Sequence, residues 1–146
     1  ALCWQGEGET SDLDVRVVSE RLTAGKILWH CVGEVNKVRE ENGGKELCVF
    51  KIGLTANPVQ RRTSYVSQNF QSFVILHVAS CVELLAQAEM LEAALIAEFF
   101  DQGRKCRNVQ LGGESMRKRD FAPRFGPPYY VYCAATSAAQ RLPILG

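Results

Sequence analysis

The feature that most constrains the fold is an apolar stripe over residues 82–101. If this segment is a helix, turning about 100° per residue, one of its faces collects Leu84, Ala88, Leu91, Leu95 and Phe99. Such a stripe must pack against another apolar surface, and two runs that are typical of strands, Phe73 to Ser80 and Leu47 to Leu54, supply one. The sequence therefore predicts a layered domain in which helices cover a sheet. Glu92 falls at the margin of the stripe.

The run Leu47 to Leu54 and the residues that precede it predict a hairpin. Ile27 to Val35 is rich in β-branched and aromatic residues, which is typical of a strand. Asn42-Gly43-Gly44 offers the positive φ angles of a tight turn. Residues 27–54 are therefore expected to form an antiparallel hairpin with an elongated tip. For residues 13–23 the pattern leaves a strand and a short helix equally open.

Local signals also predict a second helix and two later strands. Asn57 can cap free N–H groups and Pro58 suits the first helical position, which predicts a helix that ends near Gln68. Cys106 to Leu111 and Tyr129 to Ala134 are expected to be strands. The predicted fold is α+β, with a small, mostly antiparallel sheet flanked by helices and a C-terminal extension.

The chain has 146 residues, the size of one domain, and we divide it into three parts. Residues 1–25 are expected to be an N-terminal arm, 26–111 the folded domain, and 112–146 a basic loop with a last strand. The net charge of +1 argues against a protein that holds nucleic acid by bulk electrostatics. After residue 100, however, eight Lys and Arg stand against three Asp and Glu. This basic cluster is either a solvated loop or a surface for phosphates or an acidic partner.

The cysteine pattern and the hydropathy bear on the compartment. None of the six cysteines lies in a C-x-x-C pair, and their spacing matches no zinc signature. We expect free thiols in a reducing, intracellular compartment, although the sequence leaves disulfides open. No stretch reaches the roughly 18 apolar residues that a membrane span requires. The first residue is Ala1, and a start without methionine would suit an organellar protein whose targeting segment has been removed.

Four polar side chains stand where packing alone would not require them. Arg61 and Tyr65 are four residues apart on one predicted helix, so their side chains share a face. Glu92 lies on the long helix, and Asn108 lies in the strand that follows it. A carboxylate can hold Mg²⁺, the metal can activate a bound water, and an arginine can stabilise charge on a phosphate. Each residue also has an ordinary interpretation, as a surface, helix-face or turn residue.

Taken together, these residues resemble the GIY-YIG nuclease family. Lys51-Ile52-Gly53 is similar to the second triplet of that signature, and Arg61 follows the glycine by eight residues, with Tyr65 four further on. Leu91 to Ile96 is similar to the helix that supplies the family's metal-binding glutamate. Cys106 to Val109 is similar to the strand that carries its asparagine. The resemblance covers residues 26–111.

The resemblance implies a metal-dependent endonuclease. Its catalytic residues would be Arg61, Tyr65, Glu92 and Asn108, and Glu92 would bind Mg²⁺ or Mn²⁺. The family's two signature tyrosines, which help to orient the attacking water and the arginine, are absent from the matching positions.

Other residues occupy the places of the two tyrosines. Lys51 replaces one, and Trp29 or His30 lies in the neighbourhood of the other. His30 is expected to stand in as a base. Lys51 and Arg62 are the expected phosphate contacts.

Two functions from different classes follow. The first is a divergent endonuclease that hydrolyses the phosphodiesters of DNA or RNA. The alternative is a catalytically inactive fold that serves as a structural or docking subunit of a larger assembly, in an organelle if a targeting segment has been removed. The four retained polar residues favour the nuclease, while the missing tyrosines and the even charge balance favour the docking subunit with protein partners.

Overall fold

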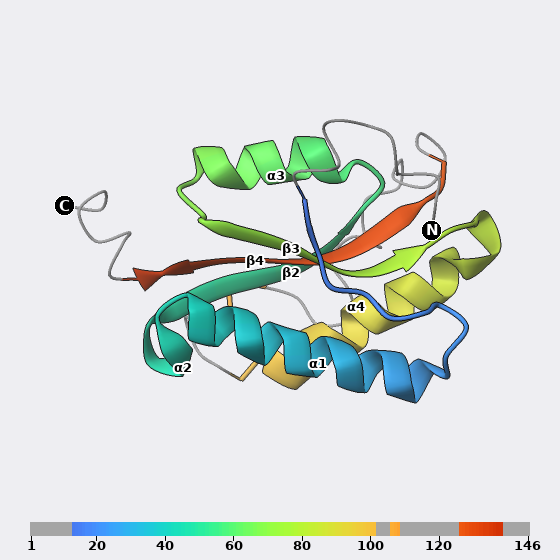
Figure 1. Ribbon diagram of the computed structural model, residues 1–146, viewed down its shortest axis with the longest axis horizontal. Coiled ribbons are helices and arrows are strands. Elements are labelled where there is room, and N and C mark those ends of the chain that lie inside the picture. The colour runs from blue at the N-terminus through green and yellow to red at the C-terminus, as the bar shows by residue number, and fades with distance from the viewer. Residues whose placement is uncertain (1–12, 102–105, 109–125, 139–146) are drawn as a thin grey trace.

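The computed structural model has helices on both faces of a four-stranded sheet (Figure 1). Helices α1 (Ala24–Glu41) and α4 (Leu85–Phe99) cover one face, and α3 (Pro58–Ser67) covers the other. This arrangement confirms the α+β class and the small, mostly antiparallel sheet. The structure describes these parts of the chain: residues 13–101, 106–108 and 126–138.

The strand order is β1-β3-β4-β2. Strand β4 (Tyr129–Ser137) pairs antiparallel with both β2 (Cys48–Thr55) and β3 (Ser72–Ala79), while the two-residue β1 (Asp14–Val15) runs parallel to β3. The strand expected in the C-terminal extension is therefore the one that joins β2 to β3. Residues 1–12 of the expected arm, and most of the basic cluster that follows residue 100, lie outside the described residues.

Alternation along β2 gives the two faces of the sheet different chemistry. Phe50, Ile52 and Leu54 pack into the core formed with α1 and α4. Because successive side chains of a strand point to opposite faces, Lys51 and Gly53 lie on the α3 side. A second apolar cluster on that side includes Tyr65 of α3 and aromatic residues of β3 and β4. One face of β2 thus packs in the hydrophobic core, and the other face carries Lys51.

The predicted strand at Ile27 to Val35 is wrong, because this segment lies within α1. The side chain of Thr23 caps the helix by accepting a hydrogen bond from the backbone N–H of Lys26, at 3.3 Å. The buried residues follow a helical period, and their packing on the sheet outweighs the β propensity of the run. They are Ile27, Cys31, Val35, Val38 and Arg39.

The predicted hairpin over residues 27–54 is wrong for the same reason. Gly43 and Gly44 do adopt positive φ angles of 97° and 77°, as the turn prediction required. They connect α1 to the single-turn helix α2 (Gly44–Leu47) instead of linking two strands. The strand that pairs with β2 is β4, about eighty residues later in the chain.

Three other predicted elements are confirmed. Asn57 caps α3 by accepting a hydrogen bond from the backbone N–H of Gln60, and Pro58 occupies the first turn. Strand β3 matches the expected run 73–80. The long helix is a 3-10 turn, η2 (Val82–Leu84), followed by α4.

One detail of the long helix differs from the prediction. Glu92 is not at the margin of its apolar stripe but fully buried, with 0% of its surface exposed.

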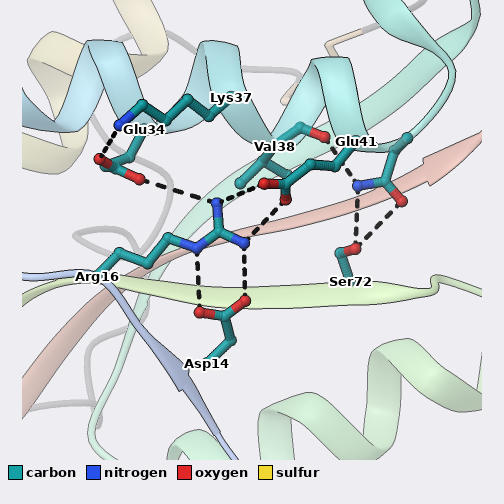
Figure 2. Close-up of polar contacts among 8 residues, drawn as sticks. Asp14, Arg16, Glu34, Lys37, Val38, Glu41 and Ser72 are labelled. Atoms are coloured by element: carbon teal, nitrogen blue, oxygen red, sulfur yellow. Dashed lines mark hydrogen bonds and ion pairs between the residues drawn. The ribbon is translucent and has the colours of Figure 1, made fainter.

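A charged network fastens the first strand to α1 (Figure 2). The guanidinium of Arg16 donates two hydrogen bonds to Asp14, at 3.0 and 2.9 Å, and two to Glu41, at 3.2 and 2.8 Å. Glu34 lies 3.8 Å from the same guanidinium and is bound in turn by Lys37. The hydrogen bonds from Arg16 to Asp14 and then to Glu41 raise the pKa of its guanidinium further above the ordinary value.

The cysteines that the structure describes are free thiols. Cys31, Cys48 and Cys133 are fully buried and pack as small apolar residues. Burial raises the pKa of Cys48 to about 11 and that of Cys31 to about 12, so these thiols stay protonated at neutral pH. Within the described segments, no helix combines the length and the apolar character needed to cross a membrane.

Candidate functional site

A polar cleft of about 310 Å³ opens on the α3 side of the sheet. Three of its lining residues are cationic and come from three different segments: Lys51 from β2, Arg61 from α3, and Arg107 from the segment after α4. The phenol of Tyr65 lines the same cleft. The full lining is Lys51, Arg61, Ser64, Tyr65, Gln68, Phe70 and Arg107.

Backbone pairing with the outer edge of β2 positions Arg107. Its N–H donates a 2.8 Å hydrogen bond to the carbonyl of Phe50, and Cys106 forms a parallel bridge with the same residue. Cys106 is buried in the core beneath the sheet, so the next side chain, that of Arg107, turns to the α3 face. The short segment 106–108 thereby brings a third cation beside Lys51 and Arg61.

Asn108 holds that segment in place. Its Oδ1 accepts a 2.9 Å hydrogen bond from the N–H of Ile52, and its Nδ2 donates a 2.7 Å bond to the carbonyl of the same residue. Asn108 is buried and does not line the cleft. The side chain predicted as catalytic therefore acts here as a clamp on the edge of β2.

Two phenols meet below the cleft. The hydroxyl oxygens of Tyr65 on α3 and Tyr132 on β4 are 3.1 Å apart, within hydrogen-bond distance. The Tyr132 ring lies directly over Gly53, its partner in the β2–β4 pairing. A Cβ atom at position 53 would overlap the hydroxyl end of that ring. A glycine is therefore needed here for close approach, and not for a special backbone angle.

The protonation state of this pair follows from its burial. Burial raises the pKa of Tyr132 well above its ordinary value, and the charge and hydrogen bond of Tyr65 act in the same direction. Arg61 lowers the pKa of Tyr132 and Glu92 raises it, so both charges lie within electrostatic range of this phenol. Tyr132 thus keeps its proton, and its hydroxyl can donate a hydrogen bond to the oxygen of Tyr65. This bond would orient the Tyr65 hydroxyl at the cleft.

The structure brings together only some of the residues predicted for the site. Arg61, Tyr65 and Lys51 line one cleft. His30 does not join them, because it lies on α1, which packs on the opposite face of the sheet. Its Nε2 is 2.7 Å from the backbone oxygen of Arg16. Arg62 is next to Arg61 on α3 but does not line the cleft.

The described residues do not fit the predicted metal site. Mg²⁺ is bound by oxygen ligands, carboxylates above all. Glu92, the predicted ligand, is fully buried in α4 and does not line the cleft, whose described lining contains no carboxylate. Across residues 13–101, 106–108 and 126–138, no three His, Cys, Asp or Glu side chains gather into a possible metal site. We therefore derive no chemical step through a metal ion.

Two residues of this region were not among the predicted ones. Arg107 carried a signal, because it belongs to the basic cluster that the charge count identified, but its place beside Lys51 depends on pairing with β2. Tyr132 carried none, because only the folded sheet shows that β4 lies against β2. Of the basic cluster's other members, Arg104, Lys105, Arg117, Lys118, Arg119 and Arg124 lie outside the described residues.

Comparison with known proteins assigns the family. The T5orf172 domain model matches residues 32–120, which is more than half of the chain. The match includes Lys51, Arg61, Tyr65 and Arg107, and it ends before β4. No curated protein and no solved structure matched the chain.

This match corrects the family suggested by the short motifs. The motif spacing pointed to GIY-YIG nucleases, but the family model that matches is T5orf172, so that assignment was wrong. Motifs of two to six residues constrain the family far less than a match of this length. The chain belongs to the T5orf172 domain family, a nuclease-like domain family.

Proposed function

We propose that this protein is an endonuclease that holds the phosphodiester backbone of a nucleic acid in the cleft of Lys51, Arg61 and Arg107. The observation that carries the proposal is the convergence of these three cations, from three separate segments, around one polar cleft. Contacts to the backbone phosphates contribute much of the affinity of proteins for nucleic acids. Arg and Lys side chains are the usual partners of these phosphates. The nuclease-like family supports the reaction class.

Within this proposal the cleft residues have separate roles. Arg61 and Arg107 bind phosphate oxygens, and a guanidinium can stabilise the charge that accumulates on them during hydrolysis. Lys51 adds a point charge at the cleft. Tyr65, whose hydroxyl is oriented by Tyr132, offers a hydrogen bond to a phosphate oxygen or to the attacking water. DNA and RNA offer the same backbone phosphate to these groups.

A specific observation favours a second candidate, in which the fold does not cleave nucleic acid and serves as a structural or docking subunit of a protein assembly. Asn108 uses both polar atoms of its amide on the backbone of Ile52, and Glu92 is buried away from the cleft lining. Both residues are among the four that the sequence assigned to catalysis, and their burial and contacts support a fold that does not cleave. This candidate corresponds to the inactive docking subunit expected as the alternative.

The test compares purified wild-type protein with two neighbouring arginine variants, Arg61→Ala and Arg62→Ala. Labelled single- and double-stranded DNA and RNA are incubated with Mg²⁺, with Mn²⁺ and with EDTA, and products are resolved on a sequencing gel. Arg61→Ala should lose about 100-fold in cleavage rate, the scale for removing one group that stabilises transition-state charge. Arg62→Ala removes the same type of side chain at a position that does not line the cleft, so it should keep the wild-type rate.

Each outcome separates the two candidates. Cleavage that is lost in Arg61→Ala and kept in Arg62→Ala supports the nuclease. The absence of cleavage on every substrate would overturn it in favour of the inactive fold. The EDTA lanes test the predicted dependence on Mg²⁺ or Mn²⁺, for which the described residues offer no ligand set.

A further inference from the structure

A bulge in β3 directs the imidazole of His77 away from α3 and toward the helices on the other face of the sheet. The pairing of β3 with β4 shifts register between Ile75 and His77. As a result, Leu76 packs in the core with α1 and α4, and the next residue, His77, lines a cavity between those helices. In a regular strand, two successive side chains would point to opposite faces. The bulge therefore places an imidazole where strand alternation would put it on the α3 side.

The cavity that His77 lines has the size of a small-molecule site. Its volume is about 580 Å³, within the range of roughly 300–1,000 Å³ that is typical of ligand pockets. The first turns of α1 form one wall, and η2 with α4 as far as Ala94 forms the other. Most lining side chains are apolar, including those of Ile27, Leu28, Leu84, Met90 and Leu91.

His77 is a polar group with unmet hydrogen-bonding capacity beside this cavity. The residue is 1% exposed, and within the described part of the chain no group hydrogen-bonds its Nδ1. An unsatisfied buried polar atom destabilises a fold, and such atoms are rare in native proteins. Burial lowers the pKa of His77, although the charge of Glu20 opposes this, so the ring is neutral at physiological pH. A neutral imidazole offers one donor and one acceptor.

We propose that this cavity binds a small apolar molecule that carries a hydroxyl group, with the hydroxyl hydrogen-bonded to the imidazole of His77. A hydroxyl both donates and accepts, so it suits either tautomer of the ring. His77 lines the cavity and its Nδ1 has no hydrogen-bond partner among the described residues, so this bond requires a rotation about the soft Cβ–Cγ bond that turns Nδ1 to the ligand. Glu83 at the cavity disfavours anionic ligands such as fatty acids. The site lies across the sheet from the cation-lined cleft and is independent of it.

The probes for this site are 2-naphthol and 2-methylnaphthalene, which have nearly the same shape and differ by one hydroxyl. The chain has only two histidines, so ¹⁵N-histidine labelling gives one signal set for His77 and one, as an internal control, for His30. We expect 2-naphthol to shift the ring nitrogens of His77 saturably and to leave those of His30 in place. It should bind about fivefold more tightly than 2-methylnaphthalene, the value of one net hydrogen bond.

A variant separates the hydrogen bond from the cavity. His77→Leu should keep the affinity for 2-methylnaphthalene and lose the preference for 2-naphthol. If this variant does not fold, the wild-type titration still decides. Equal affinity for the two probes, no saturable shift at His77, or shifts confined to His30 would each overturn the proposal.

Discussion

At the scale of single residues, the chemistry of this protein depends on which atoms of a side chain are already engaged. Asn108 was predicted to be catalytic from its type and spacing, yet both ends of its amide bind the backbone of Ile52. Sequence identifies the residue type but not this engagement, because the partner lies 56 residues away. Arg61 and Tyr65, by contrast, were predictable as a pair, since their shared helix face is a local property.

The clamp at Asn108 can be tested by Asn108→Asp. An aspartate still accepts from the Ile52 N–H, but it cannot donate to the carbonyl, which then faces a carboxylate oxygen. We expect a loss of about 2–3 kcal/mol in the free energy of unfolding, measured with urea. Asn36→Asp makes the same chemical change on α1 and should stay within about 0.5 kcal/mol of wild type. Equal, small effects at both positions would refute the clamp.

His77 gives a pH dependence whose sign follows from its burial. Its pKa is lowered in the folded state, so near the ordinary value of about 6.5 the unfolded chain binds a proton more readily than the native protein. The free energy of unfolding should therefore fall as the pH is lowered from 7.5 to 5.5, with a contribution no steeper than about 1.4 kcal/mol per pH unit. Glu20 raises this pKa and His30 lowers it. His77→Leu should flatten the urea-derived slope, and an unchanged slope would contradict the assignment.

At the scale of elements, local signals predicted β2, α3, β3 and the long helix, and they failed at α1. The run from Ile27 to Val35 has strand-like composition, but its buried positions recur every three or four residues, as in a helix. In this segment the spacing of the apolar residues indicates the helix, while the residue types indicate a strand. The pairing of β2 with β4 could not be predicted from one sequence, because no local pattern indicates which distant strand is the partner.

The attachment of β1 to α1 is the element-scale feature most open to test. Arg16 bridges Asp14 on β1 and Glu41 at the end of α1, and Glu34 adds a third carboxylate nearby (Figure 2). Arg16→Leu removes the cation that bridges Asp14 and Glu41 and should lower the free energy of unfolding by about 1 kcal/mol at low salt, because the carboxylates are partly exposed. The difference should shrink in 1 M NaCl.

Lys37→Leu is the matched control for Arg16→Leu. Lys37 is well exposed, and among the described residues its ion pair is with Glu34. Its loss should therefore change the free energy of unfolding by a few tenths of a kcal/mol at most. If the two variants were equally mild at low salt, the network would not hold β1 to α1.

At the scale of the whole molecule, the arrangement of charge matters more than its sum. A net charge of +1 argues against binding to nucleic acid by bulk electrostatics, but the net charge is a total and says nothing of where the charges lie. The fold gathers Lys51, Arg61 and Arg107 around one cleft although they come from three separate segments. A nearly neutral chain can therefore present a local cationic site, which composition alone does not reveal.

The most direct test of the central claim is the salt dependence of binding to a fluorescein-labelled single-stranded oligonucleotide, measured by anisotropy in EDTA. Each phosphate contact contributes about 0.7 to the slope of log K against log salt for a single strand. Arg61→Ala and Arg107→Ala should each reduce the slope by about that amount, and Arg62→Ala should leave it unchanged. Equal slopes for all three variants and wild type would show that the nucleic acid does not occupy this cleft.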